Sequence, residues 1–76
     1  MSDRIKAIMA KSFEVSEDAI TEQSNMDNIE TWDSLHHLKM IVFLEREFDV
    51  DIPDDMVGNM ISYKLIKSAI DGLTKS

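Results

Sequence analysis

The sequence predicts an all-α fold, a small bundle of three longer helices and one short helix with a long loop after the first helix. Three observations support this prediction. Apolar residues recur at intervals of three and four in three separate stretches. The segment between the first two stretches shows no sustained period, either helical or alternating. With 76 residues and no cysteine, the chain has the size of one domain, residues 1–76, and cannot form a disulfide.

The first helix is expected close to the N-terminus, with Ser2 or Asp3 as its N-cap. We expect it to end near Phe13 or Glu14. Four apolar side chains at helical spacing would form its inward face: Ile5, Ile8, Met9 and Phe13.

Residues 15–33 are predicted to form the long loop, with a brief helical turn around Glu17–Thr21. A connection of this length in a compact domain is usually functional or folded on itself. Trp32, the only tryptophan, is interpreted as a partly buried anchor that fixes how the loop approaches the second helix, and the alternative is that it flanks a bound group or a partner. Isolated apolar residues would attach the loop to the bundle: Val15, Ile20, Met26, Ile29 and Trp32.

The second helix is predicted to begin at Ser34, interpreted as its N-cap, and to end near Phe48. At about 100° per residue, one arc faces the core with these apolar side chains: Met40, Ile41, Leu44 and Phe48. A second apolar arc, Leu35, Leu38 and Val42, is left over and is available for a partner or a cargo. The alternative is a helix that is buried on most of its sides.

Pro53 suits the end of a loop or the first turn of a helix, and a short helix is predicted over Asp54–Met60, weakened by Gly58. Ser62 is the expected N-cap of the last helix. We expect that helix to end at Gly72 and the polar tail that follows. Its inward face is predicted to hold Ile66, Ala69, Ile70 and Leu73.

Ser34 is the strongest candidate for a functional residue. The N-terminus of a helix combines unpaired N–H groups with the positive end of the macrodipole, and this favours an esterified phosphate. Asp33 stands directly before it. A hydrolase would need a base within hydrogen-bond reach and a third orienting group, in a context that this segment lacks, so no enzyme activity is expected. His37 is interpreted as a half-buried packing residue and His36 as solvent-facing.

The net charge of −7 argues against nucleic acid as a ligand and favours basic partner surfaces. No stretch approaches the ~20 apolar residues of a membrane span and no signal peptide is visible, so we expect a cytoplasmic monomer. An EF-hand loop starting at Asp49 would need Gly and Glu where the chain has Asp54 and Met60. The acidic residues of this segment, Asp49, Asp51, Asp54 and Asp55, are therefore interpreted as solvated surface. No metal site is predicted, although weak binding of a divalent ion stays open.

Two segments carry a resemblance to a known family. Asp33-Ser34-Leu35 followed by an amphipathic helix resembles the acyl carrier and peptidyl carrier proteins. Residues 44–55 are similar to the same family, with a helix end, a Phe and an Ile-Pro-Asp sequence before a short third helix. Chain length and charge fit as well, so the resemblance covers nearly the whole chain.

The resemblance implies that Ser34 carries 4′-phosphopantetheine, attached from coenzyme A by a phosphopantetheinyl transferase whose magnesium-bound complex Asp33 helps to align. The thiol of this arm would hold an acyl or aminoacyl group as a thioester. The partners would be that transferase, an acyl- or aminoacyl-loading enzyme, and downstream transferases or synthases that bind transiently. The partner-binding residues expected are Leu35, Leu38, Lys39, Val42, Asp54 and Asp55.

Carriers of fatty-acid synthesis typically have acids along the exposed side of the second helix, where this chain has His36 and Lys39. Its acids cluster later, at Glu45, Glu47, Asp54 and Asp55. This departure from the pattern of fatty-acid carriers favours a dedicated pathway, such as polyketide or nonribosomal peptide synthesis or a specialised acyl transfer. One alternative is a housekeeping fatty-acid carrier, and another is an acidic helical adaptor that binds proteins without a prosthetic group.

Overall fold

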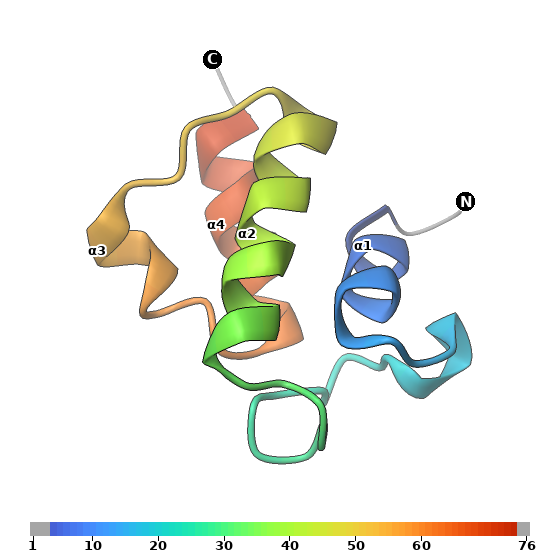
Figure 1. Cartoon of the computed structure of the whole chain (residues 1–76). Helices are drawn as coiled ribbons and strands as arrows, with labels where there is room; N and C mark the ends of the chain where they lie inside the picture. The colour runs from blue at the N-terminus through green and yellow to red at the C-terminus, as the bar shows by residue number, and fades with distance from the viewer. Residues whose placement is uncertain (1–3, 75–76) are drawn as a thin grey trace.

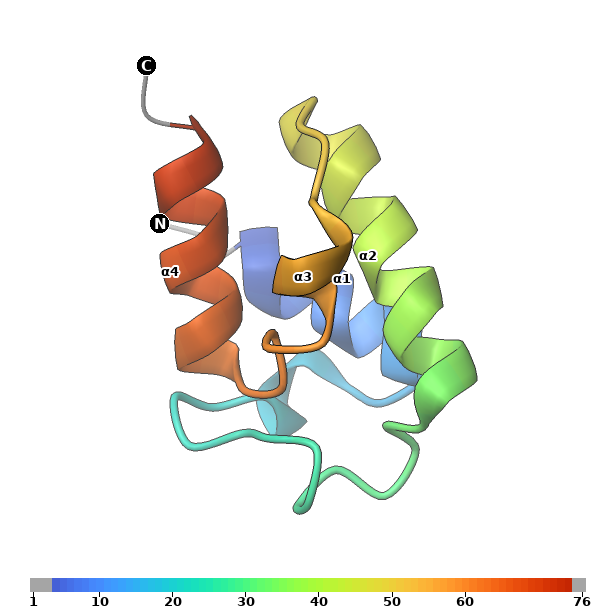
Figure 2. The same ribbon diagram turned by 90° about the vertical axis from the view of Figure 1, so that its left-hand side faces the viewer.

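The computed structural model describes residues 4–74, which form helices α1 (Arg4–Phe13), α2 (Ser34–Phe48), α3 (Asp54–Val57) and α4 (Tyr63–Thr74), with a single 3₁₀ turn, η1 (Glu17–Ala19), after α1. The prediction of three longer helices, one short helix and a long first loop is confirmed. Figures 1 and 2 show α1 and α3 on opposite sides of the pair α2 and α4, with the long loop crossing one end of the bundle. Between Arg4 and Thr74, no helix has the length and apolar content needed to cross a bilayer.

Helix α1 buries the predicted face and ends where expected. Glu14 follows it in the left-handed conformation, with φ of 58°. The N–H of Val15 then donates to the carbonyl of Ala10 at 3.1 Å, the closing bond of a Schellman motif. Helix α2 ends in the same way at Asp49, with φ of 54°. The predicted N-caps Ser2 and Asp3 lie outside the described residues.

The long loop is folded on itself and attached to the start of α4. η1 confirms the predicted helical turn. The N–H of Tyr63 donates to the carbonyl of Ser24, and the N–H of Met26 donates to the carbonyl of Ile61, both at 2.9 Å. Ile20, Ile29 and Trp32 are buried as predicted, and Val15 is half-buried.

Met26 attaches the loop to the bundle as predicted, although its side chain is 37% exposed. Its backbone, not its side chain, makes the attachment, through the hydrogen bond to Ile61. That pairing leaves the thioether at the surface. A pattern of apolar residues in the sequence does not reveal such a backbone pairing, because the two residues are far apart in the chain.

The core combines the predicted helix faces with three buried methionines, Met9, Met40 and Met60. On α2 the core-facing arc is confirmed, although Phe48 is only half-buried. On α4, Ile66 and Ile70 are buried and the other two predicted residues are half-buried. Unbranched methionine side chains fill irregular gaps between helices of unequal length, which suits a core closed by a helix of one turn.

Helix α3 is shorter than predicted, whereas α4 has the predicted extent. α3 stops at Val57 because the chain turns there, and the side chain of Met60 is drawn into the core instead of continuing the helix. Ser62 caps α4 as predicted, its Oγ accepting the N–H of Leu65 at 3.2 Å. Helix α4 continues through Gly72 and ends at Thr74, in the polar tail where its end was predicted. Half-buried Leu73 packs against the core, and that contact outweighs the cost of about 1 kcal/mol for a helical glycine.

Candidate functional site

Asp33, not Ser34, is the N-cap of α2. Its backbone is extended, with φ of −112° and ψ of −175°, and its Oδ1 accepts the N–H of His36 at 2.9 Å. The prediction of Ser34 as the N-cap is therefore wrong by one residue. A carboxylate at the N-cap accepts the same bond as a hydroxyl and adds a favourable charge at the positive end of the macrodipole, so Asp33 takes this position.

Because Asp33 is the N-cap, the hydroxyl of Ser34 does not cap the helix. Ser34 is the first residue of α2 and is exposed, and its Oγ makes no hydrogen bond with any residue between Arg4 and Thr74. The backbone N–H of Ser34 lies in the first turn of the helix, where N–H groups have no carbonyl partner within the helix. Asp33 accepts the N–H groups of His36 and His37 instead. The backbone N–H and the hydroxyl of Ser34 thus lie together at the end of the helix where negative charge is stabilised.

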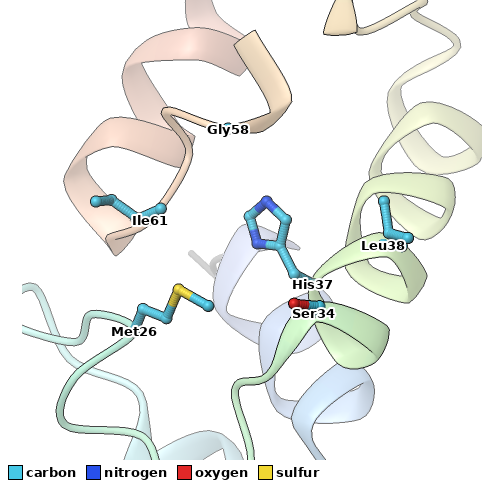
Figure 3. Close-up of a pocket in the computed structure, with 6 residues that line it drawn as sticks. All are labelled: Met26, Ser34, His37, Leu38, Gly58 and Ile61. Atoms are coloured by element: carbon cyan, nitrogen blue, oxygen red, sulfur yellow. The ribbon is translucent and has the colours of Figure 1, made fainter. Parts of the chain in front are cut away.

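A cavity of about 270 Å³ opens beside this hydroxyl, and its lining is mostly apolar. Figure 3 shows Ser34, His37 and Leu38 on α2, with Gly58 and Ile61 facing them and Met26 reaching in from the long loop. The sequence did not indicate Met26, Gly58 or Ile61 as site residues. The signal that joins two of them is the backbone pairing of the loop with the start of α4, which leaves no periodic pattern in either segment.

His37 lines the cavity and packs inward as the sequence indicated, and it is buried more deeply than the half-buried position that was expected. The indole N–H of Trp32 donates to its Nδ1 at 3.0 Å. Indole nitrogen can only donate, so Nδ1 carries a lone pair and the proton resides on Nε2. Nε2–H donates to the carbonyl of Val57 at 2.7 Å. A neutral imidazole therefore joins the loop, α2 and the end of α3.

Trp32 is the anchor that the sequence indicated, with only 3% of its surface exposed. Its ring stacks on Phe13 of α1, with the ring centroids 4.5 Å apart, and lies nearly parallel to the imidazole of His37. These contacts run from α1 through the loop to α2. They fix where the chain enters α2, and hence where Ser34 lies.

The prediction that His36 faces solvent is wrong. Its Nδ1 lies 2.7 Å from Oδ1 of Asp33 and its Nε2 lies 3.2 Å from Oε2 of Glu14, and only 22% of the side chain is exposed. Both carboxylates can only accept, so both contacts are satisfied at once when both ring nitrogens are protonated. The hydrogen bond to Asp33, followed by that to Glu14, raises the pKa of His36. The backbone N–H of His36, followed by its ring, lowers the pKa of Asp33.

We expect His36 to titrate above its ordinary pKa of about 6.5, as measured by NMR of its ring protons. Because the folded pKa is raised, the bridge to Glu14 stabilises the fold fully below about pH 6.5 and stops doing so as the pH rises through the raised value. Glu14→Gln should lower the pKa of His36. The difference in unfolding free energy between wild type and Glu14→Gln should shrink as the pH rises.

The matched control for this titration is Glu17→Gln, which removes the same charge from an exposed residue in η1. It should leave the pKa of His36 unchanged. A His36 pKa at or below about 6.5, or one that Glu14→Gln does not lower, contradicts the bridge.

Comparisons with known protein sequences identify the family of this chain. No protein-family model matches the chain. It is 40% identical to the acyl carrier protein of Lactobacillus acidophilus, over 80% of this chain and 84% of that protein. It is 32% identical to the acyl carrier protein of Campylobacter fetus, over 96% and 95%, and 37% identical to that of a Picosynechococcus, over 71% and 67%. The chain belongs to the acyl carrier protein family.

Membership in the acyl carrier protein family confirms the resemblance seen in the sequence. The relatives support an acyl carrier role. The family is known to carry a phosphopantetheine prosthetic group, and its members act as carriers for biosynthetic enzymes, not as catalysts. Between Arg4 and Thr74, no group of three acidic or histidine side chains is placed to hold a metal ion.

The outer face of α2 in this acyl carrier protein is apolar and open. The second apolar arc is 74% exposed at Leu35, 56% at Leu38 and 48% at Val42. The alternative of a helix buried on most sides is therefore wrong. Lys39 on α2 is exposed as well. Asp54 and Asp55 are exposed in the first turn of α3.

Proposed function

We propose that this chain carries acyl groups as thioesters on a 4′-phosphopantetheine arm bound to Ser34 through a phosphodiester. The observation that supports this best is the exposed hydroxyl of Ser34, which makes no hydrogen bond with the described part of the chain and lies at the first position of a helix of 15 residues. The arm, when bound, supplies the terminal thiol that forms the thioester. The chain supplies the attachment point and the surfaces around it.

The residues around Ser34 fit such an arm. The N–H of Ser34 and the macrodipole of α2 stabilise the negative charge of a phosphodiester. Asp33 supports the site indirectly: by capping α2 it leaves the hydroxyl of Ser34 free, and its contact with His36 fixes the first turn. The mostly apolar cavity at Leu38 and Ile61 offers a surface along which uncharged parts of the arm can lie.

We further propose that a phosphopantetheinyl transferase recognises Asp33 and Ser34 together, and that loading enzymes and downstream transferases or synthases are the later partners. The exposed residues Leu35, Leu38 and Val42 support a shared docking face next to the attachment point. The presence of His36 and Lys39 in the first turns of α2 favours a dedicated pathway over housekeeping fatty-acid synthesis, with an acyl or aminoacyl group as cargo.

The test is loading followed by elongation. Incubation with a promiscuous phosphopantetheinyl transferase and coenzyme A should raise the intact mass by one phosphopantetheine, and fragmentation should locate it on the peptide containing Ser34. The loaded protein should then be a poor substrate for housekeeping fatty-acid enzymes. Efficient elongation would refute the dedicated pathway alone. The absence of a mass shift with several transferases would refute the carrier role and favour the adaptor.

A further inference from the structure

Contacts with neighbouring elements define the two edges of α2. On one edge, three residues contact α1 or the residue that follows it: His36 meets Glu14, Phe43 lies under the ammonium of Lys11, and Glu47 pairs with Arg4. On the other edge, Ser34 and Leu38 line the cavity and Glu45 accepts the N–H of Ile52 at 2.9 Å. The outward stripe, formed by Leu35, Leu38 and Val42, begins at this second edge and extends toward the first.

Both acids of α2 are occupied by contacts within the chain. Glu45 bonds the backbone before α3, and Glu47 forms an ion pair with Arg4 at 2.7 Å. The lysine and the arginine of α2 are not occupied. Lys39 and Arg46 are exposed, and neither forms a hydrogen bond or an ion pair with any described residue. The charge that α2 offers to a partner is therefore positive, although the whole chain carries −7.

Both cations border the apolar stripe. Lys39 lies one turn after Leu35, and Arg46 lies one turn after Val42, so each is a neighbour of a stripe residue on the helix surface. Lys39 is also three residues after His36, and Arg46 is three residues after Phe43, which places both cations toward the α1 edge. The stripe thus has an apolar centre and a cationic border on one side.

We infer that this stripe and its cationic border are a docking surface for an amphipathic protein helix whose apolar face is bordered by carboxylates. The inference rests on the proposed function, because a partner that works on cargo must dock near Ser34. Apolar contact with the stripe supplies the buried area of the interface, and the carboxylates of the partner helix pair with Lys39 and Arg46.

The charge at the stripe is opposite in sign to the net charge of the chain. A charge of −7 attracts basic surfaces at long range, but the groups that meet a partner at the stripe are Lys39 and Arg46. A helix bordered only by lysine would bring like charges together along the α1 edge. Like-charge contact selects against wrong partners more strongly than it changes the attraction of right ones.

The test uses two synthetic amphipathic helices with an identical apolar face, one bordered by Glu and one by Lys, titrated into the ¹⁵N-labelled carrier. The Glu-bordered peptide should shift the amide signals of Leu35, Lys39, Val42 and Arg46, while the Lys-bordered peptide should shift those of the acidic residues around Asp54 instead. Lys39→Glu with Arg46→Glu should raise the Kd of the Glu-bordered peptide by about tenfold. It should also draw the Lys-bordered peptide to the stripe.

The matched control is Lys67→Glu, an equal charge change at an exposed residue of α4 away from the stripe, and it should change the Kd less than about twofold. Lys39→Gln with Arg46→Gln should weaken binding by an intermediate factor, and circular dichroism checks the fold of each variant. Tighter binding of the Lys-bordered peptide at the stripe, or equal effects of the double variant and Lys67→Glu, would overturn the inference. Failure to load with phosphopantetheine instead overturns the proposed function, because this peptide assay does not require the arm.

Discussion

Ser34→Ala should abolish loading of the protein with phosphopantetheine while leaving its fold and stability intact. The hydroxyl is exposed and makes no hydrogen bond with a described residue, so removing it should change the free energy of unfolding by less than about 0.5 kcal/mol. Alanine is also well tolerated in the first turn of a helix, and Asp33 retains the cap. Intact mass after incubation with a transferase and coenzyme A measures the loading.

The control for Ser34→Ala is Ser16→Ala. Ser16 is also an exposed serine at the start of a helical segment, and its side chain likewise makes no capping bond. Ser16→Ala should load to the same extent as wild type. Loading of Ser34→Ala at another serine would show that the attachment point has been placed wrongly, and unfolding of Ser34→Ala would show that the hydroxyl has a structural role.

Trp32→Ala should have the largest effect on stability, a loss of about 3 to 5 kcal/mol in the free energy of unfolding. A domain of 76 residues has about 4 to 11 kcal/mol in total, so the variant should lose a large share of its stability. The substitution removes the stacking on Phe13 at 4.5 Å, leaves a cavity between α1 and α2, and deprives Nδ1 of His37 of its donor. Urea unfolding followed by circular dichroism measures the loss without relying on tryptophan fluorescence.

Two further variants separate the contributions of Trp32. Trp32→Phe keeps an aromatic ring against Phe13 but removes the N–H, and should cost about 1 to 3 kcal/mol through the unpaired Nδ1 of His37. Leu35→Ala removes a large apolar side chain that is exposed, and should change stability by less than about 0.5 kcal/mol. If Trp32→Ala costs less than about 1 kcal/mol, the anchor role of this residue is wrong.

The sequence by itself determined the helices and their faces. The buried residues of α1, α2 and α4 follow from spacings of three and four, because an α-helix places such neighbours on one side wherever it lies in the fold. Ser62 as a cap, Trp32 as an anchor and the exposed stripe on α2 also follow from residues close in the chain. The choice of Ser34 as the working residue came from the same local information and stays a prediction.

Only the tertiary structure decided which groups around Ser34 are free. The bridge from His36 to Glu14 spans 22 residues, and the bond from His37 to Val57 spans 20. The pairing of Met26 with Ile61 depends on how the long loop crosses the start of α4. The spacing of residues encodes contacts within one helix, whereas contacts between segments depend on how the helices pack. The exposure of Met26, the raised pKa of His36 and the free cations beside the stripe are therefore properties of the packed bundle, not of any one segment.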